Sequence, residues 1–426
     1  MATLEAAKPG PRSFSRPPNL APHLTLSDFD CELTGRLAAL REEGLYRELR
    51  RIASPQSPRI ELDGKTLLNF SSNDYLGLAN DPTLKAAAIQ AVEQFGAGAG
   101  ASRLICGSLA PHHELDETLA AFKGAEAALS FCTGYAAAIG TVCALLGRDD
   151  FIVMDRLVHA CLVDAARLCG AKIRIFAHND LNDLESILRW GVTKRHTTHH
   201  ASRKSHLLIV TESVFSMDGD HAPLREIVKL KEKYGAWLMV DEAHATGLYG
   251  ANRRGLAEEL EVSNVIEIQM GTLGKALGAS GGYICGSRAL IDYLINRART
   301  FMFSTAPVPA ATAAAAAGVR FIESNRGEER RILLWQRVTE LSSRLKNQRP
   351  EISSAIIPIL IGDETKAVEA ASALRGQGIL VPAIRYPTVG RGQARLRVTV
   401  TASHSSADIA KLLASLQSLD FSALAG

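Results

Sequence analysis

The chain has 426 residues, 46% of them hydrophobic, and a formal net charge of +3. This length exceeds the usual size of a single domain, so we expect one large domain and at least one smaller one. The mild charge, with no basic run interleaved with aromatic residues, argues against a nucleic-acid partner, and no apolar run approaches the ~20 residues that would indicate a membrane span.

Seven cysteines are scattered along the chain and never form a C-x-x-C pair. An odd number at such spacings argues against a disulfide framework or a thiolate metal site and favours a cytoplasmic location. The first residues lack the apolar core of a secretion signal. Residues 1–25, which are rich in proline and carry scattered basic side chains, are expected to form a disordered extension.

Apolar spacing is helical from about Leu26 to Ile52 and strand-like from Ile60 to Phe70, around the turn Asp63-Gly64. Residues 26–75 are therefore predicted to form a helix and a hairpin. Over residues 76–310, helical segments alternate with short apolar runs, which indicates a large α/β domain whose mostly parallel sheet is covered on both faces. These runs are Ala127 to Phe131, Phe151 to Met154, Ile173 to Phe176, Leu207 to Thr211, Trp237 to Val240 and Val265 to Met270.

The pattern changes after a helical region from Ala310 to about Asn347. Residues 311–426 are predicted to form a smaller α+β domain, in which a further helix and three strand-like runs follow this helical region. The helix runs from Glu364 to Gln377, and the strands are Ile356 to Ile361, Ile379 to Ile384 and Ala394 to Val400. Within the large domain, the polar stretch from Lys194 to His206 lies between a predicted helix and a predicted strand and contains four histidines. A solvated loop is the favoured interpretation, with a metal site as the alternative, and no metal is expected.

Lys275 lies in the glycine-rich segment Gly271 to Gly278, directly after an apolar run. Flanking glycines allow a planar cofactor to approach a lysine closely. Schiff-base chemistry needs such an amine, partly desolvated so that it can be neutral and nucleophilic. A surface lysine in a strand-to-helix turn would give the same pattern, so the motif alone leaves both interpretations open.

Asp241 supports the cofactor interpretation, because it follows an apolar strand at the edge where ligands collect in open α/β sheets. A carboxylate there can pair with a protonated pyridine nitrogen and keep the ring electron-deficient. His159 also follows an apolar strand and could stack on the same ring. Taken alone, an aspartate at this position is more often a helix cap and a solitary histidine more often structural.

A phosphate site is predicted where the run ending at Phe131 meets an alanine-rich helix. Backbone N–H groups at a helix N-terminus bind anions, which makes Gly134 and Tyr135 candidates. Thr272, Ser304 and Thr305 are hydroxyl donors that could complete the same phosphate site. An ordinary strand-to-helix turn is the alternative.

Together these segments resemble the fold-type I pyridoxal-phosphate enzymes and, within them, the α-oxoamine synthase family. This resemblance implies that the mostly parallel sheet of the large domain has seven strands. The resemblance begins near Leu33 and continues to the C-terminal helix. It rests on specific motifs, which are Asn69 to Leu78, Gly96 to Arg103, Thr211 to Asp220, Asp241 to Gly247, Gly271 to Gly278, Arg385 to Val389 and Arg395 to Arg397.

The resemblance implies a role for each matching residue. Lys275 would bind pyridoxal 5'-phosphate covalently and move the α-proton, Asp241 would pair with the pyridine nitrogen, and His159 would stack on the ring. His244 would contact the phenolic oxygen, with Ser216 nearby. Arg397 would bind the amino acid carboxylate. On the thioester side the family residues correspond to Arg47, Asn73, Arg385 and Thr388.

The resemblance also implies an activity, the condensation of an amino acid with an acyl thioester. The segments at Ser71 to Gly77 and Ala383 to Val389 look most like the biotin-pathway member, which uses L-alanine with pimeloyl-CoA or pimeloyl-carrier protein. Glycine with acetyl-CoA, or serine with palmitoyl-CoA, are the alternatives within the family. An aminotransferase of the same fold and a non-enzymatic binding protein are the alternatives outside it. By likeness the enzyme would be a homodimer in which Ser304 and Thr305 reach the neighbour's phosphate.

Overall fold

The computed structural model describes residues 27–195, 205–345 and 353–419, in two compact units. The predicted extension over residues 1–25, and most of the histidine-rich segment from Lys194 to His206, lie outside these ranges. The first unit ends at Leu49 and the second begins at Arg50. The domain boundaries predicted from the sequence stay predictions.

The first unit contains one helix, α1 (Asp28–Glu42). It begins at the N-cap Ser27, whose hydroxyl accepts from the Asp30 backbone N–H. The helix is about ten residues shorter than the pattern from Leu26 to Ile52 predicts, because the chain turns at Gly44, where φ is +66°. The apolar spacing continues past Gly44, so the sequence pattern does not show that the helix ends there.

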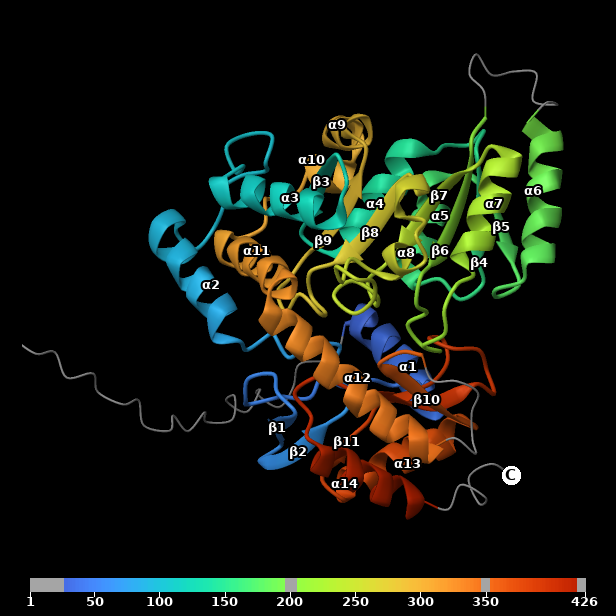
Figure 1. The fold of residues 1–426 in the computed structure, drawn as a ribbon. Coiled ribbons are helices and arrows are strands. Elements are labelled where there is room, and N and C mark those ends of the chain that lie inside the picture. The colour runs from blue at the N-terminus through green and yellow to red at the C-terminus, as the bar shows by residue number, and fades with distance from the viewer. Residues whose placement is uncertain (1–26, 196–204, 346–352, 420–426) are drawn as a thin grey trace, which may run out of the picture. The chain divides into compact units, whose positions relative to one another are not determined.

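The core of the second unit is a seven-stranded sheet in the order β3-β9-β8-β7-β6-β4-β5 (Figure 1). Strands β8, β7, β6, β4 and β5 are parallel, and β9 runs antiparallel to both of its neighbours. The predicted mostly parallel seven-stranded sheet is therefore confirmed. Its strands are β3 (Ala127–Phe131), β4 (Phe151–Asp155), β5 (Lys172–Phe176), β6 (Leu207–Glu212), β7 (Trp237–Asp241), β8 (Ile268–Thr272) and β9 (Gly282–Gly286).

Helices cover both faces of this sheet because alternate strand residues point to opposite sides. Ile209 and Val240 pack into one apolar core, whereas Val210 and Met239 pack into a second, separate core. The first core includes residues of α3 (Ala110–Lys123), α6 (Leu181–Arg195) and α7 (Leu224–Tyr234). The second includes residues of α4 (Gly134–Leu145), α5 (Ala160–Cys169) and α9 (Arg288–Arg297).

The second unit also contains two three-stranded sheets. The predicted hairpin forms with β1 (Arg59–Leu62) and β2 (Lys65–Asn69), joined at Asp63 and Gly64, which both have positive φ. Strand β11 (Ile379–Leu380) extends it in parallel. The third sheet has the order β10-β13-β12, with β10 (Ile356–Gly362), β13 (Ala394–Thr399) and β12 (Ala383–Ile384).

Two predicted strands need correction. Ile379 to Ile384 is divided between two sheets, because Pro382 lacks the N–H that a continuous strand would use. Val265 to Met270 starts with a 3₁₀ turn (Ser263–Val265), and pairing begins only at Ile268. The remaining helices are α2 (Pro82–Phe95), α8 (Leu256–Glu259), α10 (Arg299–Met302), α11 (Pro309–Glu323), α12 (Asn325–Leu345), α13 (Glu364–Gly376) and α14 (Ser406–Gln417).

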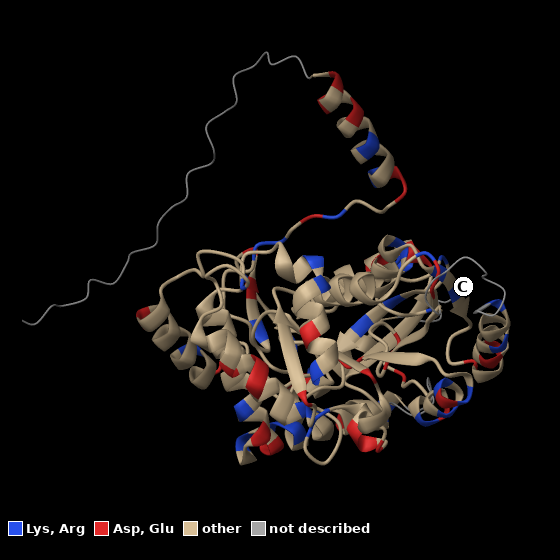
Figure 2. Cartoon of the chain, turned by 90° about the horizontal axis from the view of Figure 1, so that it is seen from above, with Lys and Arg blue, Asp and Glu red and all other residues tan. Residues whose placement is uncertain are grey.

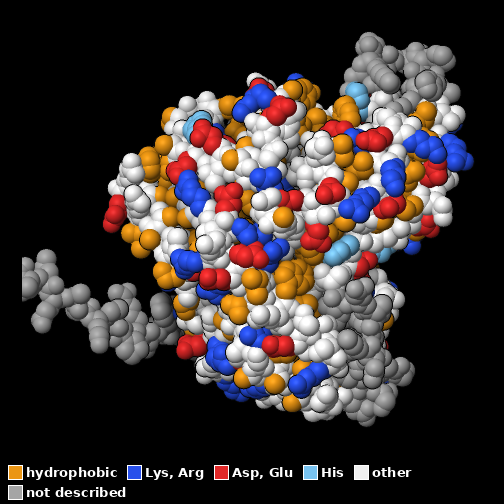
Figure 3. Space-filling view, in the orientation of Figure 1, with side chains coloured by type: hydrophobic (Ala, Val, Ile, Leu, Met, Phe, Trp, Pro, Cys, Tyr) orange, Lys and Arg blue, Asp and Glu red, His pale blue; other side chains and the backbone are white. Residues whose placement is uncertain are grey.

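Charged residues lie mainly on helices and loops, and the strands of the large sheet are mostly uncharged (Figure 2). On the face seen in Figure 3, acidic and basic side chains are interspersed with apolar ones. Among the described helices, none is both long and apolar enough to span a bilayer.

A buried ion pair ties α3 to the end of β7. Lys123 Nζ lies 2.5 Å from Glu242 Oε2 and also donates to the Arg254 carbonyl, and both charged side chains are almost fully inaccessible. The other oxygen of Glu242 accepts from the Ala257 N–H. Because Glu242 directly follows Asp241, this pair fixes the chain at the end of the strand that carries the predicted cofactor ligand.

We expect Lys123→Ala to lower the free energy of unfolding by about 3–5 kcal/mol, since it leaves the Glu242 carboxylate buried without a counter-charge. Chemical denaturation measures this loss. Lys233→Ala is the matched control, because Lys233 forms an ion pair with Glu185 but is mostly exposed. The control should change the unfolding midpoint little. Equal losses for both variants would contradict a special role for the buried pair.

Candidate active site

The predicted catalytic residues converge at the carboxyl-terminal edge of the large sheet, the usual ligand position in open α/β folds. Asp241 is the last residue of β7, and the register of the parallel pair places it directly beside Glu212, the last residue of β6. Both carboxyl groups are buried. The sheet therefore brings two acidic groups together, only one of which was predicted as a site residue.

Lys275 lies in the connection between two antiparallel strands, β8 and β9, rather than in a strand-to-helix turn. The connection is closed at its base by the Leu273 N–H, which donates to the Gly281 carbonyl at 2.9 Å. Gly278 has φ of +66°, and a Cβ there would lie 2.6 Å from atoms of Leu78, so this turn requires glycine.

The Lys275 amine lies at the start of a short hydrogen-bonded chain. Its Nζ is 2.8 Å from His244 Nε2, and His244 Nδ1 is 2.5 Å from the Tyr75 hydroxyl. Burial lowers the pKa of His244 well below its usual value, and the positive charges of Lys275 and Arg397 lower it further. Burial raises the pKa of Tyr75 to about 12. A neutral imidazole between a phenol and an amine can accept from one and donate to the other.

Burial has the largest effect on the pKa values of the ionisable groups around this hydrogen-bonded chain of side chains. Burial lowers the pKa of Lys275, against the opposing effect of Asp241 and Glu212. Burial, and then the charge of Asp241, raise the pKa of Glu212 to about 8. Burial likewise raises the pKa of Asp241, which Lys275 opposes. The amine is thus held in an environment that favours its neutral, nucleophilic form.

Arg397 presents an unfilled hydrogen-bonding position inside the site. It is buried on β13, and its Nε donates to the Ser216 carbonyl at 2.7 Å. Its Nη1 donates to Asn73 Oδ1 at 3.1 Å and to the Thr399 hydroxyl at 2.9 Å. Its Nη2 is buried with no hydrogen-bond partner in the described part of the chain. Since such a donor is costly to leave unpaired, the site is suited to a carboxylate ligand.

His159 is the N-cap of α5, where its Nδ1 accepts from the Cys161 N–H at 3.3 Å. Partial removal from water lowers the pKa of His159, and the charge of Asp241 opposes this shift. The imidazole is therefore near enough to the Asp241 carboxylate to be affected by its charge, and its stacking on a cofactor ring stays a prediction.

The predicted phosphate ligands have different surroundings. Gly134 begins α4, and a Cβ on Gly282 would lie 2.4 Å from its Cα, so only glycine fits where β9 passes the helix start. The Tyr135 hydroxyl donates to Asp164 at 2.8 Å. Thr272 Oγ1 donates to the Gly281 carbonyl at 3.1 Å. Gly134 thus lies at a helix N-terminus, the kind of position that binds anions, and a side chain at residue 282 would crowd it.

Ser304 and Thr305 lie after α10, close to the strand that leads to this helix start. The Thr305 carbonyl accepts from the Cys132 thiol at 3.4 Å. The Ala306 N–H donates to the Ala101 carbonyl at 3.0 Å, which joins this segment to the glycine-rich run from Gly96 to Arg103. Phosphate binding by either hydroxyl stays a prediction.

The residues predicted on the thioester side are only partly brought together. Asn73 contacts Arg397, as described above. Arg385 directly follows β12, and its carbonyl accepts from the Thr388 N–H at 3.0 Å in a turn next to the sheet that carries Arg397. Arg47 belongs to the first unit, so its predicted role stays untested.

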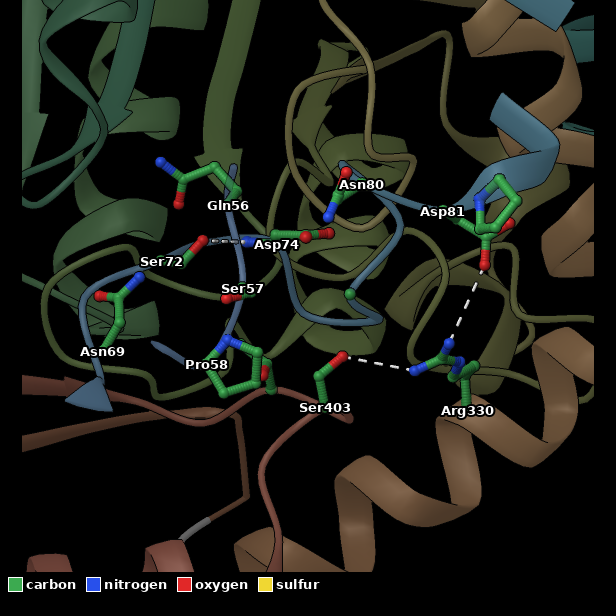
Figure 4. Close-up of a pocket in the computed structure, with 13 residues that line it drawn as sticks. Gln56, Ser57, Pro58, Asn69, Ser72, Asp74, Asn80, Asp81, Arg330 and Ser403 are labelled. Carbon is green, nitrogen blue, oxygen red and sulfur yellow. Dashed lines mark hydrogen bonds and ion pairs between the residues drawn. The ribbon is translucent and has the colours of Figure 1, made fainter. Parts of the chain in front are cut away.

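A separate polar cavity of about 180 Å³ lies beside the Asn73 segment (Figure 4). Ser72 and Asp74, which flank Asn73, line it together with Asp81 and Arg330. Arg330 points toward Asp81 on one side and Ser403 on the other. Lys275, Asp241, His244 and Arg397 are not among its lining residues, so this cavity is distinct from the predicted cofactor site.

Comparison with known proteins identifies the family of the chain. The aminotransferase class I and II family matches residues 65–416. An 8-amino-7-oxononanoate synthase of Geobacter sulfurreducens is 44% identical over 90% of this chain and 96% of its own. The chain belongs to the α-oxoamine synthases of this family. The resemblance inferred from the motifs is therefore confirmed.

Solved structures of α-oxoamine synthases show the same fold. A variant of serine palmitoyltransferase from S. paucimobilis, with bound PLP–myriocin aldimine, superposes with a TM-score of 0.83 at 29% identity and covers 91% of this chain and 96% of its own. An 8-amino-7-oxononanoate synthase from Francisella tularensis gives a TM-score of 0.68 at 26% identity, covering 82% and 96%.

The side chains of this α-oxoamine synthase fit a pyridoxal phosphate. They supply an amine of lowered pKa at Lys275, a carboxylate at Asp241 and an imidazole at His159, together with a helix start at Gly134 for the phosphate. Arg397 Nη2 and Glu212 Oε1 have no hydrogen-bond partner among the described residues, and a polar ligand in the site would satisfy them. A cationic ring beside Asp241 would favour the ionised form of that carboxyl.

Sequence reasoning missed Tyr75 and Glu212. Each had a usable signal: Tyr75 lies inside the motif from Asn69 to Leu78, and Glu212 ends β6 just as Asp241 ends β7. Glu212 Oε2 accepts from the Ser216 N–H at 3.2 Å, which links it to the segment that Arg397 contacts.

We expect Glu212→Gln to stabilise the cofactor-free protein increasingly as the pH rises from about 4.5 to about 8. In this range the folded protein keeps a proton that the unfolded chain has released, so wild-type stability falls with pH. Glutamine resembles the protonated group and should remove this slope. Chemical denaturation at a series of pH values measures it, with the exposed Glu61→Gln as control. If stability falls with pH as steeply in Glu212→Gln as in the wild type, the raised pKa of Glu212 is contradicted.

Proposed function

We propose that the protein is a pyridoxal-phosphate-dependent acyltransferase that condenses L-alanine with pimeloyl-CoA, or with pimeloyl-carrier protein, to form 8-amino-7-oxononanoate in biotin biosynthesis. The observation that carries this proposal is the buried Arg397 Nη2, which lacks a partner among the described residues and lies in the same site as Lys275. The similarity to named 8-amino-7-oxononanoate synthases, which reaches 46% identity, supports the choice of substrates.

The cofactor would be held by the residues that meet at the sheet edge. Lys275 would bind it covalently, Asp241 would pair with its ring nitrogen, and His159 would cover the ring. His244 and Ser216 would contact its phenolic side. Gly134, Tyr135, Thr272, Ser304 and Thr305 would surround its phosphate.

When bound, pyridoxal phosphate supplies an electron sink for bonds broken at the α-carbon of an amino acid. Arg397 would orient alanine by donating from its buried Nη2 to the carboxylate, so that the bond to be broken is presented to the ring. Lys275, released as a free amine, would take the α-proton and later return one. His244, supported by Tyr75, would hold Lys275 in place, and burial lowers the pKa of the amine toward its neutral form.

The new carbon–carbon bond would join the alanine α-carbon to the thioester carbonyl, with release of the thiol. Loss of the alanine carboxylate as CO₂ and return of a proton would then give the amino ketone. Asn73, Arg385, Thr388 and Arg47 would line the acyl thioester side. No two cysteines in the described part of the chain form a disulfide, which supports a reducing, cytoplasmic location.

Incubation of the cofactor-loaded protein with alanine and pimeloyl-CoA should release one thiol for each 8-amino-7-oxononanoate detected by mass spectrometry. Lys275→Ala should abolish turnover, and borohydride should label Lys275 in the wild type. Lys233→Ala, an exposed substitution of the same kind, should remain active.

Three other outcomes would each contradict the proposal. A preference for glycine with acetyl-CoA, or for serine with palmitoyl-CoA, would assign the protein to another α-oxoamine synthase activity. Formation of a 2-oxo acid without thiol release would indicate an aminotransferase. Borohydride labelling of a different residue would remove Lys275 from the mechanism.

The protein is further proposed to act as a homodimer with the phosphate side of the site at the subunit interface. Leu104, Ile105, Phe303 and Val308 are large apolar residues with 44–79% of their surface exposed. They lie on two segments joined by the hydrogen bond from Ala306 to Ala101. Exposed apolar residues gathered in this way are typical of subunit interfaces, and Ser304 and Thr305 belong to the same segment.

Sedimentation of the intact chain should therefore give a dimer. The double variant Ile105→Asp and Phe303→Asp should give a monomer, because charges at the centre of an apolar interface oppose association. Leu168→Asp, at an exposed apolar residue on α5, should remain dimeric. A wild-type monomer, or a double variant that stays dimeric, would contradict this part of the proposal.

A further inference from the structure

His178 bridges two carboxylates outside the set of residues discussed so far. It follows β5, the edge strand of the large sheet, at the same carboxyl-terminal edge as the site. Its Nδ1 lies 2.9 Å from Asp155 Oδ1, and its Nε2 lies 2.7 Å from Asp220 Oδ2. Both ring nitrogens can donate at once only when the imidazole is protonated.

The first carboxylate organises the segment that carries His159. Asp155 ends β4 and is buried, and its Oδ1 also accepts from the Leu157 N–H at 2.8 Å. Its Oδ2 accepts from the N–H of Asn179, a residue held at φ of +56°. Asp155 therefore shapes the turn between β4 and α5, whose N-cap is His159.

The second carboxylate organises the segment that carries Ser216. Asp220 lies in the loop after β6, which is closed by the Phe215 N–H donating to the Asp220 carbonyl and by the bridge between Val214 and His221. Ser216 is inside this loop and accepts from Arg397. The edge of the Phe215 ring packs against His178, with ring centroids 4.4 Å apart.

We propose that His178, protonated between Asp155 and Asp220, is a positioning residue that locks the His159 turn to the Ser216 loop and so fixes two walls of the cofactor site. This inference rests on the proposed function for its effect on catalysis. The ion triad itself needs no substrate or cofactor.

The surroundings of His178 favour its charged form. Burial by itself would lower its pKa, but the hydrogen bonds to Asp155 and Asp220 outweigh burial and raise the pKa to about 10. In the described part of the chain, Asp155 and Asp220 are the charged groups that contact the imidazole ring. The other residues in contact with the ring, Asn179 and Phe215, are uncharged. With a neutral side chain at this position, the two carboxylates would face each other without a cation between them.

The sign of the resulting pH dependence follows from the raised pKa. The triad should stabilise the fold fully below about 6.5, where histidine is protonated even in the unfolded chain. This contribution should be lost as the pH rises through about 10. Between these values the folded protein binds a proton that the unfolded chain lacks.

The test compares wild type, His178→Gln, Asp220→Asn and the double variant, each with and without cofactor. The stability advantage of cofactor-free wild type over His178→Gln should be constant below pH 6.5 and shrink toward pH 10. The double variant should be more stable than His178→Gln, because it removes one of the two facing carboxylates. His113→Gln, at an exposed histidine on α3, is the control and should show no such pH dependence.

With cofactor bound, His178→Gln should reduce the visible circular dichroism band and lower kcat about tenfold to a hundredfold, as expected for a misplaced cofactor pocket. The double variant should recover part of both signals. Parallel pH profiles for wild type and His178→Gln, or a double variant no better than His178→Gln, would overturn the proposal. If the stability results hold but turnover of alanine and pimeloyl-CoA is absent, the triad stands and the proposed reaction fails.

Discussion

The site depends on keeping charged groups away from water at the end of a parallel sheet. The register of β6 and β7 places Glu212 beside Asp241, and the strands leave little space there for solvent. Desolvation of this kind disfavours charge, which is why Lys275 is held toward its neutral form. The buried pair of Lys123 and Glu242 then fixes the residue that directly follows β7. In this way the fold holds in place the end of the strand, where the site requires burial.

Much of the fold could be predicted because the sheet strands are continuous apolar runs, and six of the seven are recognisable in that way. Strand β9 was missed, since Gly282–Gly286 is short and has glycine at both ends, a pattern that resembles a turn. It is recognisable only from its two partners, β3 and β8. The early end of α1 had a similar cause, because apolar spacing continues beyond the glycine that stops the helix.

The candidate site was predicted where a residue follows directly from a strand, as Asp241 and His159 do. Contacts between distant segments could not be predicted in this way. The hydrogen bond from Tyr75 to His244 joins residues 169 positions apart, and that between Arg397 and Asn73 spans 324. The partners of His178 are similarly set by the packing of three strand ends, although each residue taken alone looks like an ordinary polar side chain in a loop.

The single reversed strand gives Lys275 an unusual support. Most ligand-binding loops in α/β folds lead into a helix, whose movements they share. The nine residues between Thr272 and Gly282 instead leave one strand and return on its neighbour, with Leu273 and Gly281 hydrogen-bonded at the base. The lysine backbone is therefore clamped at both ends by the sheet, while its four-carbon side chain reaches from the loop to His244. The bond making and bond breaking proposed at the amine would then be accommodated by rotations within this side chain, with the surrounding main chain kept in place.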